Sequence, residues 1–160
     1  KAYGLSSIDL HSNGLKSEQN LVLRNLRWPV SGKRLRGFGA YVDPLFETNH
    51  FSNGWLIQST PKAEVHVIES GKVIYSGWFK GYGNLVIVQH STRVHSLYAQ
   101  LGALRVRANE TVSIDDVIAL TRQDRDKNSG QVYFEIRKDK VAFDPKLVLN
   151  VPRAVSKGPR

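Results

Sequence analysis

Histidine is the side chain in this sequence most able to carry metal or acid–base chemistry, and cysteine is absent. Without cysteine, disulfides, thiolate metal sites and cysteine nucleophiles are excluded. The histidines are scattered along the chain, at His11, His50, His66, His90 and His95. Because scattered histidines usually make structural hydrogen bonds, we do not expect them to form a metal site.

A second set of polar side chains lies where polar and apolar residues alternate. In residues 131–137, one face should belong to the core, with Val132, Phe134 and Ile136, and the other carries Gln131, Tyr133, Glu135 and Arg137. In residues 94–101, the same alternation places Tyr98 and Gln100 on one face, opposite His95 and Leu97. Two neighbouring strands would then present Tyr and Gln side chains on one mixed surface, which suits recognition or is an ordinary solvated sheet face.

The elements that would position these side chains are short runs rich in Val, Ile and Tyr, separated by Gly, Asn and Asp, a pattern typical of an all-β domain. The predicted strands are 55–59, 64–69, 72–76, 85–89, 94–101, 117–121 and 131–137. Upstream, Ser17 could cap a short helix that ends at Leu26 and needs a docking surface to be stable. We predict one antiparallel β domain at 27–150, a linker or regulatory segment at 1–26, and a basic, flexible tail at 151–160.

Composition limits the function classes further. A chain of 160 residues can form one compact domain, and no apolar run approaches the length of a membrane-spanning helix. No apolar segment of a signal peptide follows Lys1. The net charge of +9 favours an acidic partner. The basic residues are spread along the chain without a nucleic-acid-binding motif, so we do not expect nucleic acid to be that partner.

Seven segments follow one another in a recognisable order: Trp28-Pro-Val-Ser-Gly, Gly37-Phe-Gly, Gly71-Lys-Val-Ile-Tyr-Ser-Gly-Trp, Gly81-Tyr-Gly-Asn-Leu-Val-Ile-Val-Gln-His90, Leu97-Tyr-Ala-Gln-Leu, Val132-Tyr-Phe-Glu-Ile-Arg and Phe143-Asp-Pro145. Their order resembles that of the LytM (lysostaphin-like) metallopeptidases, which have an antiparallel β fold also called the duplicated hybrid motif. In one later segment the family carries glycines where this chain has Asn109 and Asp115. Asn and Asp tolerate positive φ best after Gly, so the resemblance predicts left-handed turns there.

The resemblance also locates the zinc site of catalytic members. It implies a His and an Asp four residues apart, a late His-x-His and a helper His; those positions here hold Ser52, Leu56, Gln100, Gln131 and Tyr133. None of these is an imidazole or carboxylate ligand, and without ordered zinc nothing lowers the pKa of a water toward neutrality. The resemblance therefore implies a degenerate domain with no metal, no cofactor and no catalytic residues, so we expect a protein that is not an enzyme.

Two features make the chain most similar to the EnvC-type activators of cell-division amidases. Tyr133 stands in place of the zinc His, and the other feature is the segment Gly77-Trp-Phe-Lys-Gly-Tyr-Gly83. The resemblance implies a periplasmic protein of a Gram-negative bacterium that docks a zinc-dependent N-acetylmuramoyl-L-alanine amidase in its former active-site groove. Docking would promote septal peptidoglycan cleavage and daughter-cell separation, and an upstream helix could occupy and inhibit the groove. Carried over, the groove consists of Asn53, Leu56, Trp78, Tyr82, Gln100, Gln131, Tyr133 and Arg137.

Other interpretations remain open. Arg137 could bind a partner's carboxylate through two hydrogen bonds, and the charged loop 121–130 would alter the groove rim and the partner that fits it. The chain could instead bind peptidoglycan itself, with Trp55 and Trp78 as exposed aromatic contacts. An enzyme with an atypical metal site is a further alternative.

Overall fold

The computed structural model describes residues 25–123 and 128–154. Their elements, in chain order, are β1 (Leu26–Arg27), β2 (Lys33–Arg36), β3 (Gly39–Val42), β4 (Asn49–Ser52), β5 (Trp55–Ser59), β6 (Glu64–His66), β7 (Gly71–Phe79), β8 (Gly83–Gln89), β9 (Val94–Leu104), β10 (Thr111–Val112), β11 (Val117–Thr121), β12 (Gly130–Lys138), β13 (Val141–Phe143), the 3-10 turn η1 (Pro145–Leu147) and β14 (Leu149–Val151). The predicted all-β fold is confirmed. No helix in these residues is long and apolar enough to cross a membrane.

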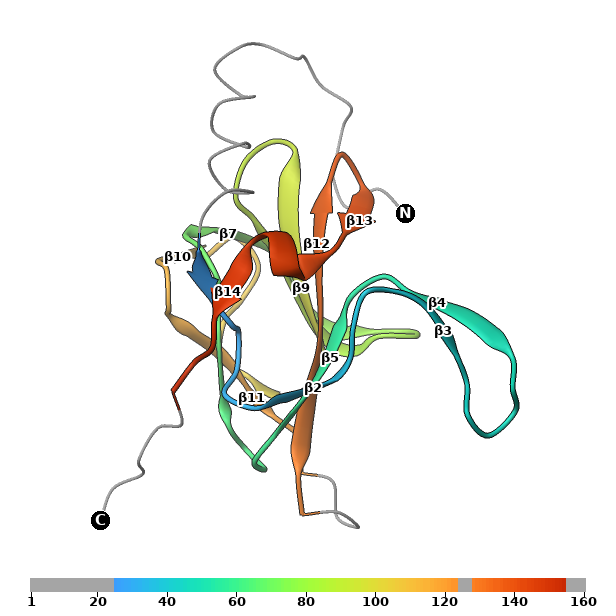
Figure 1. The fold of residues 1–160 in the computed structure, drawn as a ribbon. Coiled ribbons are helices and arrows are strands. Elements are labelled where there is room, and N and C mark those ends of the chain that lie inside the picture. The colour runs from blue at the N-terminus through green and yellow to red at the C-terminus, as the bar shows by residue number, and fades with distance from the viewer. Residues whose placement is uncertain (1–24, 124–127, 155–160) are drawn as a thin grey trace.

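One ten-stranded sheet forms the body of the domain (Figure 1). Its main path runs in the order β10-β7-β8-β9-β12-β5-β2, while β11 joins β9 to β6 and β13 pairs with β12. Neighbouring strands in this sheet are antiparallel. β3 and β4 form a two-stranded sheet of their own, and they project from the body as a separate hairpin. Strand β12 lies between β9 and β5, so its outer face is at the centre of the sheet.

The predicted strands correspond to the long strands of this sheet. β5 and β11 have the predicted bounds, β7, β8, β9 and β12 extend beyond them, and β6 ends at His66 rather than at residue 69. The core face of β12 is also as expected, because Val132, Phe134 and Ile136 are fully buried. Strands β2, β3 and β4 were not predicted from the sequence, and the hairpin that contains two of them borders the functional site described below.

The two turns inferred from the resemblance have the expected backbone conformation. Asn109 has a φ of 77° and Asp115 a φ of 71°, so both residues are left-handed where the family carries glycine. Asp115 also connects two distant parts of the chain. Its carbonyl accepts a hydrogen bond from His66 Nδ1 at 2.8 Å, and its carboxylate lies 2.7 Å from Arg153 Nη2. The side chain therefore provides contacts that a glycine would lack.

The folded body extends slightly beyond the predicted domain boundaries. Leu26, which we assigned to the preceding segment, is buried and pairs with Leu149. Arg153, which we assigned to a flexible tail, donates to the Trp28 carbonyl at 2.9 Å in addition to its pair with Asp115. Both are therefore part of the described fold. The predicted helix lies outside the described residues except at its last two positions, where Leu26 begins a strand, and residues 124–127 of the charged loop also lie outside them.

Candidate functional site

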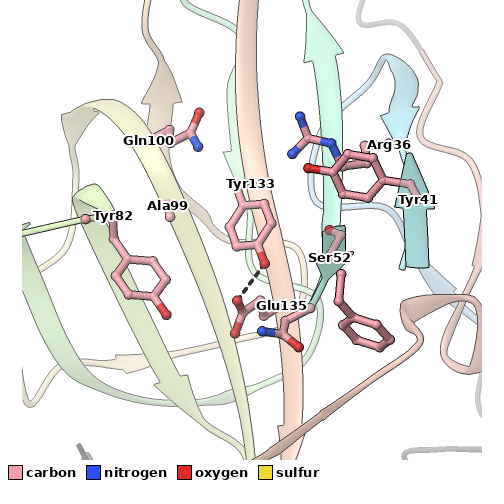
Figure 2. Close-up of a pocket in the computed structure, with 11 residues that line it drawn as sticks. Arg36, Tyr41, Ser52, Tyr82, Ala99, Gln100, Tyr133 and Glu135 are labelled. Carbon is pink, nitrogen blue, oxygen red and sulfur yellow. Dashed lines mark hydrogen bonds between the residues drawn. The ribbon is translucent and has the colours of Figure 1, made fainter. Parts of the chain in front are cut away.

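A pocket of about 410 Å³ lies on the outer face of β12, between the β3–β4 hairpin and the turn that joins β7 to β8. It is lined by Arg36, Tyr41, Phe51, Ser52, Asn53, Gly81, Tyr82, Ala99, Gln100, Tyr133 and Glu135. Figure 2 shows Tyr133 in the middle, with Tyr82 and Gln100 on one side and Arg36, Tyr41 and Ser52 on the other. We call this pocket the groove.

The structure brings together the five positions that the resemblance matches to the zinc ligands and helper histidines. Ser52, Gln100 and Tyr133 line the groove, and the Gln131 amide donates a hydrogen bond to Gln100 Oε1 at 2.5 Å. Leu56 lies directly across from Tyr133 in the β5–β12 ladder and is half-buried, but it does not line the groove. Positions far apart in the sequence therefore lie close together, three of them in the groove and two beside it.

The chemistry of these side chains does not fit zinc. The convergent groups are a hydroxyl, two amides, a phenol and an aliphatic side chain, whereas zinc sites in proteins use imidazole, thiolate and carboxylate. The Ser52 hydroxyl is buried and already donates to the Gly54 carbonyl at 2.9 Å. Within residues 25–123 and 128–154, no three His, Cys, Asp or Glu side chains lie close enough to hold a metal ion.

A buried carboxylate at the base of the groove organises its central side chains. Glu135 is 2 % exposed; its Oε2 accepts a hydrogen bond from Tyr133 Oη at 2.6 Å, and its Oε1 lies 2.6 Å from Arg137 Nη2 and 2.8 Å from Nε. Burial, and then the hydrogen bond to Glu135, raise the pKa of the Tyr133 phenol above its ordinary value of 10. The phenol therefore stays protonated and donates to Glu135 (Figure 2).

The same contacts revise the expected role of Arg137. Burial is the largest single influence and lowers the pKa of Arg137, but the attraction and hydrogen bond to Glu135, together with the nearby Tyr82 and Tyr133, raise that pKa overall, so the guanidinium stays charged. Two of its nitrogens are engaged with Glu135 and the third donates to the Lys140 carbonyl at 3.2 Å. Arg137 is not among the lining residues. Its carboxylate partner is thus within its own strand, and it holds Glu135 in place beneath Tyr133.

The expected shared surface of Tyr98 and Tyr133 is wrong. Tyr133 is paired with Ala99, whereas Tyr98 is paired with Phe134 and packs on its ring in the core, with ring centres 5.3 Å apart. Gln100 reaches the groove only because β9 is irregular there: the pairing register with β8 shifts, and Gln100 adopts a φ of 60°. The irregularity turns Gln100 to the face of Ala99 and Tyr133 rather than that of Tyr98.

Only some of the other side chains that we expected to contact a ligand or partner lie at the groove. Tyr82 and Asn53 line the groove, whereas Trp78 lies outside the lining set and is 66 % exposed. Trp55 is not an exposed contact: it is buried in the core, with its ring 5.0 Å from that of Trp28. Sequence reasoning missed six lining residues, namely Arg36, Tyr41, Phe51, Gly81, Ala99 and Glu135. Of these, the Arg36 guanidinium lies over the Tyr41 ring, 5.1 Å from the ring centre.

The described histidines serve the fold, as expected, with one exception. His50 contacts Thr48 at 2.7 Å, His66 contacts the Asp115 carbonyl, and His90 contacts the Ser70 carbonyl and Ser96 Oγ at 2.9 and 2.8 Å. His95, the exception, is buried with neither ring nitrogen hydrogen-bonded. His11 lies outside the described residues. None of the four described histidines lines the groove.

The buried state of His95 predicts a pH dependence of stability. Burial, and then the nearby His90, lower the pKa of His95 from 6.5 to about 4, and burial also lowers that of His90. The unfolded chain therefore binds more protons below about pH 6.5, so stability is full above that pH and falls toward pH 4, by up to about 1.4 kcal/mol per pH unit for each imidazole. Urea unfolding at pH values from 8 to 4.5 will measure this slope, and His95→Leu should reduce it. An unchanged slope in the variant would contradict the assignment.

Comparison with known proteins agrees with this geometry. Residues 50–145 match peptidase family M23, so the chain belongs to this family. The structure of lysostaphin, an antimicrobial peptidase from Staphylococcus simulans, is similar with a TM-score of 0.66 and 20 % identity over 83 % of this chain and 57 % of that one. A chain of the SpoIIQ–SpoIIIAH pore-forming complex has a TM-score of 0.65 and 21 % identity over 81 % of this chain and 94 % of that one. At these identities, the two likenesses show the fold alone.

Among curated proteins, the chain is similar to two activators from Escherichia coli strain K12. It is 30 % identical to the murein hydrolase activator EnvC over 118 residues, which cover 74 % of this chain and 27 % of EnvC. It is also 30 % identical to the murein hydrolase activator NlpD over 120 residues, which cover 74 % of this chain and 30 % of NlpD. The chain therefore spans less than a third of the length of either relative.

Proposed function

We propose that this chain is the activating domain of a murein hydrolase activator and has no hydrolase activity of its own. The observation that carries the proposal is the convergence of Ser52, Gln100 and Tyr133 in the groove of an M23 fold, where catalytic members hold zinc and its helper histidine. The similarity to EnvC and NlpD, both named murein hydrolase activators, supports the same function. The same similarity supports our further proposal that the protein is periplasmic and comes from a Gram-negative bacterium.

The partner that we propose is a zinc-dependent N-acetylmuramoyl-L-alanine amidase, docked in the groove to promote septal peptidoglycan cleavage and daughter-cell separation. The groove has the features of a protein-binding site, because Tyr41, Tyr82 and Tyr133 combine aromatic area with hydroxyl groups. Tyr133 is held by Glu135 and is therefore preorganised. Preorganisation reduces the ordering cost of binding. The amide pair of Gln100 and Gln131 adds polar contacts on one side.

Dye release from labelled peptidoglycan tests this proposal, with the chain alone, the amidase alone and both together. We expect release only with both, and a loss of about tenfold or more in Tyr133→Ala, which removes the central ring of the groove. Tyr133→Phe keeps the ring and should retain most of the activation. Leu147→Ala, at an exposed position outside the groove, is the matched control and should activate like the wild type.

The other outcomes of this assay separate the alternatives. Release by the chain alone that a chelator abolishes would overturn the non-catalytic proposal and favour an atypical metal site. Activation that survives in Tyr133→Ala, with the fold intact by circular dichroism, would place amidase docking elsewhere on the chain.

A peptidoglycan-binding module is the second candidate, and the exposed ring of Trp78 favours it. The positive net charge would attract an anionic cell-wall polymer. Since Trp55 is buried, the expected pair of aromatic contacts is reduced to Trp78. Cosedimentation with purified sacculi tests this candidate: retention that is lost in Trp78→Ala would support it, and no retention of the wild-type chain would exclude it.

A further inference from the structure

The β3–β4 hairpin exposes large apolar side chains at its end. The connection between the two strands is the segment Asp43-Pro44-Leu45-Phe46-Glu47-Thr48, which we call the tip. Leu45 is 78 % exposed and Phe46 is 70 % exposed. Figure 1 shows the hairpin reaching away from the main sheet, so the tip does not cover the core. Contiguous apolar side chains exposed in this way mark interaction sites.

The tip is a defined turn. Asp43 Oδ1 accepts hydrogen bonds from the backbone N–H groups of Leu45 and Phe46 at 2.8 and 3.1 Å. The Asp43 N–H donates to the Thr48 carbonyl at 2.8 Å, and the Glu47 N–H donates to the Asp43 carbonyl at 2.7 Å. These bonds fix the backbone that bears Leu45 and Phe46. Fixing them before binding lowers the entropy lost when a partner immobilises them.

The base of the hairpin belongs to the groove. Tyr41 on β3 and Phe51 and Ser52 on β4 line the groove, and Tyr41 is stacked both on His50 and beneath the Arg36 guanidinium. A partner that fills the groove therefore contacts the same hairpin that carries the tip. Because the hairpin is a two-stranded sheet, which is only marginally stable alone, these contacts at its base hold the tip at a set position beside the groove.

The charge of the tip indicates what it binds. Asp43 and Glu47 flank Leu45 and Phe46, and residues 37–61 contain no Lys or Arg in a chain of net charge +9. A surface of anionic lipid would repel these carboxylates. An apolar pocket with a basic or neutral rim on a protein would accommodate the apolar side chains and the carboxylates together.

We propose that the tip is a second anchor for the hydrolase that occupies the groove: Leu45 and Phe46 insert into an apolar pocket of that enzyme, and Asp43 and Glu47 face its rim. This inference rests on the proposed function. In this proposal, the tip strengthens the binding of the hydrolase and fixes its orientation, while Tyr133 contacts the hydrolase in the groove.

The test compares Leu45→Ser/Phe46→Ser with Ile114→Ser/Leu147→Ser, which removes an equal number of exposed apolar side chains outside the groove and the tip. The probe is a recombinant zinc-dependent N-acetylmuramoyl-L-alanine amidase, and its Kd for the full chain is measured by calorimetry. We expect the tip variant to raise Kd by about tenfold or more, because buried aromatic and aliphatic anchors dominate interfaces. The control variant should keep the wild-type Kd, and both variants should keep the wild-type urea midpoint.

The outcomes separate this inference from the proposed function. Wild-type binding that is lost in Tyr133→Ala but unchanged in the tip variant would overturn the second anchor and leave the groove proposal standing. A wild-type chain that neither binds nor activates the amidase would overturn both. Binding to vesicles of phosphatidylglycerol and phosphatidylethanolamine that is lost in the tip variant would overturn the choice of a protein partner.

Discussion

Glu135→Leu is expected to lower the free energy of unfolding by about 3 kcal/mol, because it removes one member of a buried ion pair and leaves the other without compensation. Glu135 is almost wholly buried, and the Arg137 side chain is only 22 % exposed. The variant also deprives Tyr133 of its hydrogen-bond acceptor. Urea unfolding at pH 7, followed by tryptophan fluorescence, measures the change.

A double variant separates the contribution of the ion pair from the other causes of the stability lost in Glu135→Leu. Glu135→Leu/Arg137→Met replaces both charges by apolar groups, and it should recover most of the stability because no uncompensated charge remains. Tyr133→Phe removes only the phenol oxygen and should cost about 1 kcal/mol. A double variant no more stable than Glu135→Leu would show that the loss comes from packing rather than from the charge left on Arg137.

Runs rich in Val, Ile and Tyr between turn residues predicted the long strands, and in β12 alternation also identified the core face, because its two faces meet different neighbours. Val132, Phe134 and Ile136 show this pattern in β12, and each is in the core. Strand β2 gave no such signal: all its residues are exposed, and it exists because it pairs with β5. The β3–β4 hairpin was missed for a related reason. Its apolar residues do not pack in the core, so they do not show the alternation of apolar and polar residues that core packing produces.

The faces of β9 could not be assigned from its own sequence. Val94–Ala99 are buried on both faces, so the alternation of residue types does not distinguish core from groove. The turn of Gln100 toward the groove depends on the irregular pairing with β8, a property of two strands together. The order of motifs, by contrast, selected Ser52, Gln100 and Tyr133, which line one pocket, because segment order specifies the topology that brings these positions together.

The hydrogen bonds within β12 were beyond sequence reasoning for a different reason. Alternation placed Tyr133, Glu135 and Arg137 on one face, but it could not show that Glu135 is the most buried of them or that it binds both neighbours. Burial at this position comes from the neighbouring strands. As a result, Arg137 was interpreted as a contact for a partner, whereas its guanidinium is engaged within its own strand.

The arrangement of the groove predicts that a zinc site can be built in it by substitution. Ser52→His/Leu56→Asp/Tyr133→His places the expected ligand types at the three positions that the resemblance identifies. Ser52 and Tyr133 line one groove, and Leu56 is directly opposite Tyr133 on the neighbouring strand. Glu135, which now accepts from Tyr133, lies where a carboxylate could orient a ligating imidazole through its second nitrogen. We expect about one zinc ion per chain by metal analysis, against none for the wild type.

Zinc should also stabilise the triple variant, because a ligand that binds only the folded state adds about 2.7 kcal/mol when its free concentration is 100 times Kd. Thermal unfolding with zinc and with a chelator measures this difference, and Ser52→His/Leu56→Asp alone should respond much less for lack of the third ligand. Peptidase activity is not expected, since Gln100 and Gln131 still occupy the positions of the assisting histidines. A folded triple variant that holds no zinc would mean that the backbone positions in the groove do not suit a zinc site, which would weaken the proposal that the groove corresponds to the active site of catalytic members.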